Sequence, residues 1–219
     1  MELWAVHRSL AVDAPVTVGA AGGWPPALLD AVLHGAGFVP EHGVQDGAGV
    51  WRRARTLADT VDEGMNVLLV GLNPSVYSAD VGSGFARPGN RFWPAATAAG
   101  LVSVARDPLH ALTHHHVGMT DLVKRATARA DELDPSEYRT GLERLRLLVE
   151  WLQPGVVCIV GLTGWRLAVD RRAIAGVQPE PFAGRPVYLM PNPSGLNAHV
   201  TVDGLSDHFR AALGATLPR

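Results

Sequence analysis

The stretch VLLVGLNPS, residues 67–75, joins an apolar run to a polar loop and indicates the class of fold. Its first four residues, Val67 to Val70, are all aliphatic, which is typical of a short strand buried on both faces of a sheet. Gly71 ends the run, and Asn73 and Pro74 favour a turn because Asn tolerates unusual backbone angles and Pro fixes its own φ. The stretch therefore predicts a buried strand that leads into a polar loop.

Two more short apolar runs repeat this pattern farther along the chain. Val156 to Val160 ends in Gly161, and Val187 to Met190 ends in Pro191-Asn192-Pro193. Such strands alternating with helices predict a three-layer α/β/α fold around a central, mostly parallel sheet of four to five strands. In open sheets of this class, ligands bind beyond the carboxyl ends of the strands. We therefore expect the loops after the first and third runs to lie side by side at a binding site.

A long amphipathic helix is predicted between the first two runs. Asp134-Pro135 supplies an N-cap followed by a proline at the first helical position, and Pro154-Gly155 stops the helix. Its apolar face is formed by leucines at helical spacing, namely Leu142, Leu145, Leu148 and Leu152.

Residues 1–60 are predicted to form an N-terminal extension ahead of a domain at residues 61–219. The segment from Ala20 to Trp24 indicates a glycine-rich turn and Pro26 to His34 a short helix, which together resemble a small βαβ-like element. The basic residues Arg52, Arg53 and Arg55 have two interpretations. They belong to a packing extension, or they grip nucleic-acid phosphates.

The bulk composition is that of a folded soluble protein, with 47% hydrophobic and 18% charged residues in a chain of 219. No apolar run approaches the ~18 residues needed to span a bilayer, and the N-terminus lacks the pattern of a secretory signal. We therefore expect a cytoplasmic protein that contacts no membrane, and a monomer, since no seam for association is visible. The net charge of −2 leaves no general basic footprint, although a local patch is enough to bind phosphates.

Neither a metal nor a cofactor is expected. The single cysteine, Cys158, lies in an apolar run and excludes both an internal disulfide and a cluster held by four thiolates. Three consecutive histidines, His114 to His116, cannot all face one ion from regular structure, and no carboxylate or cysteine stands at ligand spacing. Gly82-Ser83-Gly84 lacks the full dinucleotide fingerprint, which argues against a nucleotide-cofactor enzyme.

The loop PNPSGLNAH, residues 191–199, surrounds one apolar residue, Leu196, with polar ones. A lone leucine in a loop has two interpretations. It tucks into the core, or it acts as a wedge of the kind that DNA-distorting proteins push into the base stack.

Four separated motifs resemble the mismatch-specific branch of the uracil-DNA glycosylase superfamily, which includes the thymine-DNA glycosylases. That branch carries G-I-N-P-G, N-[RH]-F-W, G-[VI]-T-x-L and N-P-S-G-L segments. The chain has GLNPS at 71–75, NRFW at 90–93, GMTDLV at 118–123 and NPSGL at 192–196. The resemblance runs from about Asn66 to the C-terminus. It implies an enzyme that flips uracil out of double-stranded DNA, U·G mismatches first, and hydrolyses its N-glycosidic bond to leave an abasic site.

The resemblance also implies roles for particular residues. Asn73 would orient the attacking water, Phe85 would stack on the extruded base, Asn192 would lie near the base carbonyl, and Ser78 would face the C5 side of the base. The same motifs supply the other base-binding positions, Gly71, Leu72, Ser75 and Asn90. Leu196 would be the wedge that fills the gap in the duplex, and the loop around it supplies further DNA contacts through Ser194, Gly195 and His199.

These roles agree with simple physical chemistry. Extruding a base costs a few kcal/mol of stacking and pairing, and least at a mismatch, while stacking on Phe85 would return ~1–3 kcal/mol. A neutral amide at Asn73 can position a water through its carbonyl but is no strong base. The chemistry is therefore expected to depend on departure of the uracil anion, with backbone N–H groups and Asn192 stabilising the charge on the base.

Three departures from the family pattern limit this transfer. Ser75 replaces the usual glycine and adds a hydroxyl where water and base should meet. Asp80 is a carboxylate that the pattern lacks; it is a general base if it faces the pocket, and otherwise it is solvated or caps a turn. Ala198-His199 stands where a relative has an arginine near the widowed guanine, so His199 is a candidate substitute.

Two alternatives remain open at this point. One is a glycosylase of the same fold for another base, such as hypoxanthine, a 5-substituted uracil or ethenocytosine. The other is a non-catalytic protein that binds lesions because the altered loop at Ser75 no longer positions water.

Overall fold

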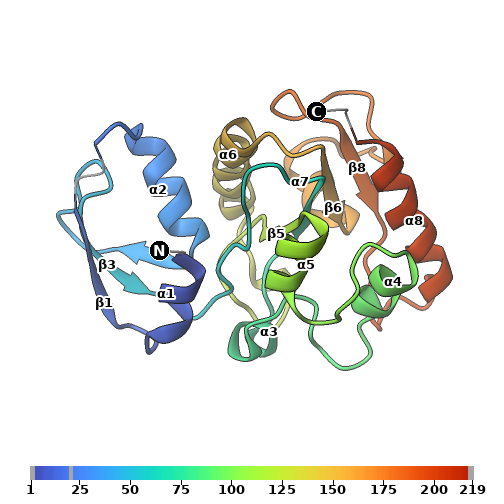
Figure 1. Ribbon diagram of the computed structural model, residues 1–219, viewed down its shortest axis with the longest axis horizontal. Coiled ribbons are helices and arrows are strands. Elements are labelled where there is room, and N and C mark those ends of the chain that lie inside the picture. The colour runs from blue at the N-terminus through green and yellow to red at the C-terminus, as the bar shows by residue number, and fades with distance from the viewer. Residues whose placement is uncertain (1–2, 20–21, 217–219) are drawn as a thin grey trace.

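The computed structural model describes residues 3–19 and 22–216 as two packed units, seen side by side in Figure 1. The smaller unit at the N-terminus consists of α1 (Leu3–Ser9), β1 (Pro15–Val18), α2 (Pro26–Gly35), β2 (Phe38–Pro40) and β3 (Gly49–Arg53). The expected turn from Ala20 to Trp24 lies partly outside the described residues.

In the N-terminal unit, β3 pairs antiparallel with both β1 and β2, in the order β1-β3-β2. β1 and β2 therefore run in the same direction and are joined through α2, so the expected βαβ-like element is present with a third strand inserted between its two strands. The unit has its own core, in which Trp51 and Phe38 are each 2% exposed and pack with Leu29 and Leu33.

The larger unit is built on a five-stranded sheet in the order β5-β4-β6-β8-β7. β4 (Val67–Gly71), β5 (Val117–Asp121), β6 (Val156–Val160) and β8 (Val187–Met190) are parallel, and the short β7 (Gly176–Val177) is an antiparallel edge strand. The three predicted apolar runs are β4, β6 and β8, which confirms the mostly parallel α/β sheet.

Helices cover both faces of this sheet and confirm the three layers. On one face α4 (Phe92–Ala98), α5 (Pro108–His115) and α8 (Val202–Gly214) pack against alternate strand residues such as Val67 and Leu69. On the other, α6 (Pro135–Leu152) and α7 (Leu162–Ala168) pack against Leu68 and Val70. Within residues 3–19 and 22–216, no helix is both long and apolar enough to cross a membrane.

α6 is the helix predicted from its cap signals. Asp134 accepts a hydrogen bond from Ser136 N at 2.8 Å, and Glu137 accepts one from Asp134 N at 2.8 Å, so both ends of the capping box are made. The helix ends at Leu152 before Gln153, whose φ of 48° lies in the left-handed region. α6 also packs against α2 and so joins the two units.

The strand β5 was not predicted from the sequence, because a glycine and two polar residues interrupt its apolar run. Gly118 is required where it stands, since a Cβ there would collide with Met65 Sδ. β5 pairs with β4 from Val67–Val117 to Gly71–Asp121. It therefore adds a second polar strand end beside the loop that follows β4.

Candidate active site

The segment that precedes α4 and the loop that follows β8 are joined to each other. Arg91 donates from its backbone N to Pro193 O at 3.0 Å, and from Nη1 to Ser194 O at 3.2 Å and to Asn197 O at 3.0 Å. Gly195 lies so close that a Cβ there would be 2.8 Å from the carbonyl oxygen of Gly89. Arg91 thus holds the segment before α4 against the loop that follows β8.

Asn73 is held by its amide nitrogen. Nδ2 donates to Thr127 Oγ1 at 2.8 Å, to Arg125 O at 3.0 Å and to Pro74 O at 3.2 Å. Within the described part of the chain, its carbonyl oxygen Oδ1 accepts no hydrogen bond. Asn73 thus presents an acceptor whose orientation is set by three contacts.

Asn192 is held in the opposite sense. Its Oδ1 accepts a hydrogen bond from Ser194 N at 2.9 Å, and its backbone carbonyl accepts one from Asn197 Nδ2 at 3.1 Å. The Nδ2 group of Asn192 donates to no other described residue and is exposed at the loop surface. One site asparagine therefore offers an acceptor and the other a donor, as water positioning and base recognition would respectively require.

A small cavity beside β4 and β5 brings Phe85 and Asp121 together. Asp121 lies opposite Gly71 in the β4–β5 pair, and a Cβ at Gly71 would collide with Asp121 Oδ1 and lie 3.4 Å from Phe85 Cζ. Phe85 is fixed by stacking on the fully buried Phe92, with ring centroids 4.1 Å apart and an interplanar angle of 10°. The absence of a side chain at Gly71 thus leaves room for both groups.

The environment of Asp121 raises its pKa to about 6. Burial is the main cause; Lys124 and Arg144 act against it, and Asp59 adds to it. The Asp121 side chain lines this cavity and forms no hydrogen bond with any other described residue. Asp121 is therefore a carboxyl group that changes its charge near neutral pH and opens toward the cavity, which are properties of a general base.

A buried charge cluster lies behind Asp121 and links the two units. Asp59 accepts hydrogen bonds from Lys124 Nζ at 2.6 Å, Arg144 Nη1 at 2.8 Å and Thr120 Oγ1 at 2.6 Å. Arg144 Nη2 also donates to the backbone carbonyl of Asp121 at 2.6 Å. Burial would raise the pKa of Asp59, but the two cations hold it below its usual value. The cluster fixes the end of β5 and so positions Asp121.

The two sequence departures near Asn73 have structural explanations. Ser75 is the N-cap of α3 (Val76–Val81), where its Oγ accepts from Ser78 N and donates to Ser78 Oγ, both at 3.1 Å. Asp80 forms a bidentate pair with Arg55 at 2.7 and 2.6 Å, which lowers the Asp80 pKa, and it lines no cavity with Phe85. The proposed role of Asp80 as a general base in the pocket is wrong, because its carboxylate is bound to Arg55 at the surface.

The basic cluster of the N-terminal extension is likewise engaged within the protein. Arg55 binds Asp80, Arg52 forms an ion pair with Glu41, and Arg53 donates to the backbone carbonyl of His7 at 3.4 Å. These contacts favour the packing interpretation of the three arginines.

Three predicted base-binding residues have other contacts. The side chain of Leu72 packs into the core on the α6–α7 face, so only its backbone lies at the loop. Asn90 accepts a hydrogen bond from Phe92 N at 2.9 Å and thereby helps to begin α4. Ser78 is 3% exposed, and its hydroxyl bonds to Ser75.

Leu196 is 94% exposed at the tip of its loop. The interpretation that it tucks into the core is therefore wrong, because the turn below it is closed by Ser194, whose Oγ accepts from Leu196 N at 3.3 Å. His199 is exposed on the same loop, and its backbone N donates to Asn197 Oδ1 at 3.4 Å. The loop thus projects an apolar side chain away from the protein.

The histidines at the end of α5 contact each other and a neighbouring serine. His114 stacks on His110 with centroids 4.1 Å apart, and His115 Nε2 bonds to Ser103 Oγ at 2.8 Å. Within the described residues, no group of three or more His, Cys, Asp or Glu side chains is arranged to hold a metal ion.

Asp121 is the site residue that sequence reasoning passed over. It stands inside the GMTDLV segment, but only its place at the end of an unrecognised strand shows that it reaches the same sheet edge as Asn73. The available signal was its position directly after residues 117–120. These residues mix apolar and polar side chains and could have been read as a strand beside β4.

Comparisons with known proteins match this chain to a solved structure and to a family model. A solved structure from Methanosarcina acetivorans, a candidate uracil DNA glycosylase determined by solution NMR, matches with a TM-score of 0.49 and 20% sequence identity. The match covers 71% of this chain and 96% of that one. The family model of the uracil DNA glycosylase superfamily matches residues 58–215, which include all four motifs and both site loops. The chain therefore belongs to the uracil DNA glycosylase superfamily.

Proposed function

We propose that the protein is a monofunctional uracil-DNA glycosylase that hydrolyses the N-glycosidic bond of a uracil flipped out of double-stranded DNA, with U·G mismatches as its preferred sites. The observation that carries this proposal is the opposite presentation of two amides, an acceptor at Asn73 and a donor at Asn192, on loops that follow two parallel strands of the same sheet. Membership of the superfamily supports the general activity, and the arrangement of these two side chains supports the mechanism.

The proposed reaction adds one water to the sugar. The water oxygen forms a bond to C1′ of the deoxyribose while the bond from C1′ to N1 of uracil breaks, and its electron pair leaves with the base as the uracil anion. Asn73 Oδ1 accepts one hydrogen bond from the water and so orients it. Asn192 Nδ2 donates to the base and stabilises its negative charge, the role of an oxyanion donor.

Asp121 is the proposed acceptor of the proton that the water loses. The neutral amide of Asn73 is not a base, so without Asp121 the proton must pass to solvent. A carboxylate whose pKa lies near 6 is ionised at neutral pH and is still basic enough to take the proton. Asp121 comes from the segment that continues as Arg125 and Thr127, the partners of Asn73.

Preference for a mismatch follows from the cost of extrusion. A mispaired uracil loses less pairing energy than a paired one when it leaves the stack. The exposed Leu196 would enter the vacated space, and Phe85, backed by Phe92, offers its ring to the flipped base. Leu196 and Phe85 assist extrusion from either pair, and the lower cost of extrusion favours U·G over U·A without any contact to the opposite base.

The lesion-binding alternative loses its main support. It required the Ser75 hydroxyl to disturb the position of the water, but this hydroxyl is used to cap α3 and to bind Ser78. A glycosylase for another base remains the second candidate. Ser78 and Asn192 are the residues expected to face the base, so they would decide which base is bound.

The test is single-turnover cleavage of labelled duplexes that contain one U·G, U·A, T·G or hypoxanthine pair. Wild-type protein should release uracil fastest from U·G, and Asn73→Ala should reduce that rate by about 10²-fold or more. Faster release of hypoxanthine than of uracil would instead support the second candidate. Binding of every duplex with release from none would refute the proposed enzyme.

A further inference from the structure

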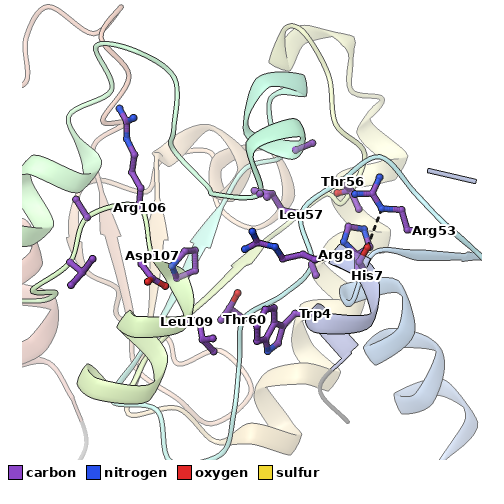
Figure 2. Close-up of a pocket in the computed structure, with 16 residues that line it drawn as sticks. Trp4, His7, Arg8, Arg53, Thr56, Leu57, Thr60, Arg106, Asp107 and Leu109 are labelled. Carbon is purple, nitrogen blue, oxygen red and sulfur yellow. Dashed lines mark hydrogen bonds between the residues drawn. The ribbon is translucent and has the colours of Figure 1, made fainter. Parts of the chain in front are cut away.

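A cavity of about 430 Å³ lies between the N-terminal unit and the larger unit (Figure 2). One wall comes from α1 and β3, through Trp4, Arg8 and Arg53. The opposite wall comes from the segment before α5, which carries Arg106 and Asp107. Residues 56–60, which connect the two units, pass between these walls.

Three arginines line this cavity, Arg8, Arg53 and Arg106; Figure 2 shows the Arg8 guanidinium pointing into it and the Arg106 side chain turned away from it. Arg8 and Arg106 form no ion pair or hydrogen bond through their side chains within residues 3–19 and 22–216. The one carboxylate in the lining, Asp107, is already used as the N-cap of α5, where it accepts from His110 N at 2.9 Å. The cavity therefore carries an excess of positive charge without a partner on the protein.

The imidazole in the lining adds no further charge. His7 is 2% exposed and lies within hydrogen-bonding distance of Ala54 O, at 3.1 Å. Burial, with Arg53 as the next cause, lowers the pKa of His7 to about 4, so its ring is neutral at physiological pH. The positive charge of the cavity thus comes from guanidinium groups, which are suited to bidentate contacts with phosphate oxygens.

This cavity adjoins the one that holds Phe85 and Asp121. Both are lined by Leu57, Ala58, Thr60, Gly82 and Pro108, which form a shared wall. Arg8 is placed against this wall, since its Cζ atom lies 3.6 Å from the position of a Cβ at Gly82. A nucleic-acid strand with one base near Phe85 would therefore have this basic cavity directly beside it.

We propose that the cavity between the two units is a phosphate-binding site in which Arg8 binds the phosphate, the exposed Arg106 turns toward it from the opposite wall, and Arg53 adds charge. The proposal rests on the glycosylase function in one respect: the expected source of the phosphate is the backbone of the DNA strand beside the flipped base. A free phosphate compound shares the same chemistry and is the other source. The N-terminal unit, which precedes the family match at residues 58–215, would then extend the contact with DNA.

The first experiment measures binding to a duplex that carries a non-cleavable uracil analogue, as a function of salt concentration. Each lost phosphate contact lowers the slope of log K against log salt by about 0.9. Arg8→Gln and Arg106→Gln should each show this loss, and the double variant about twice the loss. Arg8→Lys should keep most of the slope. Arg146→Gln is the matched control, because Arg146 is exposed on α6 and paired with Glu150, away from the cavity.

The second experiment measures binding of inorganic pyrophosphate to the full chain by titration calorimetry. A reduced salt slope in the arginine variants identifies the DNA backbone as the ligand. An unchanged slope with pyrophosphate binding lost in Arg8→Gln identifies a free phosphate compound, and the site stands. Unchanged slopes together with no pyrophosphate binding would overturn the proposal.

Failure of the glycosylase proposal is distinguishable from failure of this one. If wild-type protein releases no uracil and binds no duplex, the proposed function fails, but the pyrophosphate titration still tests the cavity. If it releases uracil normally and Arg8→Gln and Arg106→Gln match Arg146→Gln in both experiments, only the phosphate site is refuted. Thermal unfolding of each variant shows that the fold is retained.

Discussion

Asp121 and Gly71 face each other at the ends of two parallel strands, and the Asp121 carboxyl occupies the space that a side chain at residue 71 would need. The glycine of the first motif is thus required by a residue 50 positions away, on a strand that the sequence pattern did not reveal. Phe85 lies close to the same point. The packing of Gly71, Asp121 and Phe85 therefore depends on the absence of a methyl group at residue 71.

Gly71→Ala should therefore damage the site by overpacking. The added methyl must displace Asp121, at a cost of about 1–3 kcal/mol in the free energy of unfolding. In a double-mutant cycle, Asp121→Ala should relieve most of that cost, since it removes the colliding atom. Chemical denaturation of the four proteins measures the coupling, and additive effects would show that the two residues do not touch.

Asp121→Asn should abolish a pH dependence of uracil release. In the wild type the single-turnover rate should rise with pH and level off above about pH 6, as the carboxyl ionises. The variant should be about 10²-fold slower at pH 8 and flat across this range. Asp80→Asn is the matched control, because it also removes a carboxylate but one that is bound to Arg55; its pH profile should equal that of the wild type.

The same substitution should have the opposite effect on stability. A carboxyl whose pKa is raised on folding contributes stability that is fully present below its unfolded pKa of about 3.9 and is lost as the pH rises through about 6. Asp121→Asn removes the cost of ionising a buried group, so at pH 8 it should be more stable than the wild type by about 1–3 kcal/mol. Urea denaturation at pH 8 and pH 4.5 should show a clearly larger gain at the higher pH.

Asp59→Asn should be strongly destabilising. It leaves Lys124 and Arg144 buried without their counter-charge, which costs about 3–5 kcal/mol in comparable buried pairs. In the molecules that still fold, loss of the negative charge of Asp59 should lower the pKa of Asp121. The rise in the pH–rate profile should therefore move to lower pH. A variant that unfolds no more easily than the wild type would show that the cluster is not an energetic link between the two units.

Leu196→Ala should separate activity from stability. The side chain is 94% exposed, so the free energy of unfolding should change by no more than about 0.5 kcal/mol. Loss of the wedge should slow release from U·A more than from U·G, because the paired uracil is harder to extrude. Fluorescence of 2-aminopurine beside the uracil reports the extrusion itself, and equal flipping in both proteins would remove Leu196 from that role.

Much of the larger unit was predictable from short-range pattern. The strands at Val67, Val156 and Val187 and the capped helix from Pro135 were each recognisable, because an uninterrupted apolar run or a capping box is a local signal. β5 was not recognisable, since Gly118 and its polar neighbours hide the run that pairs with β4. The inserted third strand of the N-terminal unit was missed for the same reason, since pairing order is set by contacts between distant segments.

The sequence by itself determined the class of fold, the family and the two loops that carry Asn73 and Asn192, because each of these is written in contiguous residues. Only the tertiary structure decided which atoms those residues present. In the folded protein Asn73 presents its amide carbonyl and Asn192 its amide nitrogen. Asp80 is bound to Arg55, and Asp121 lies beside Phe85. Charge state and orientation depend on neighbours from other strands, so no local pattern can report them.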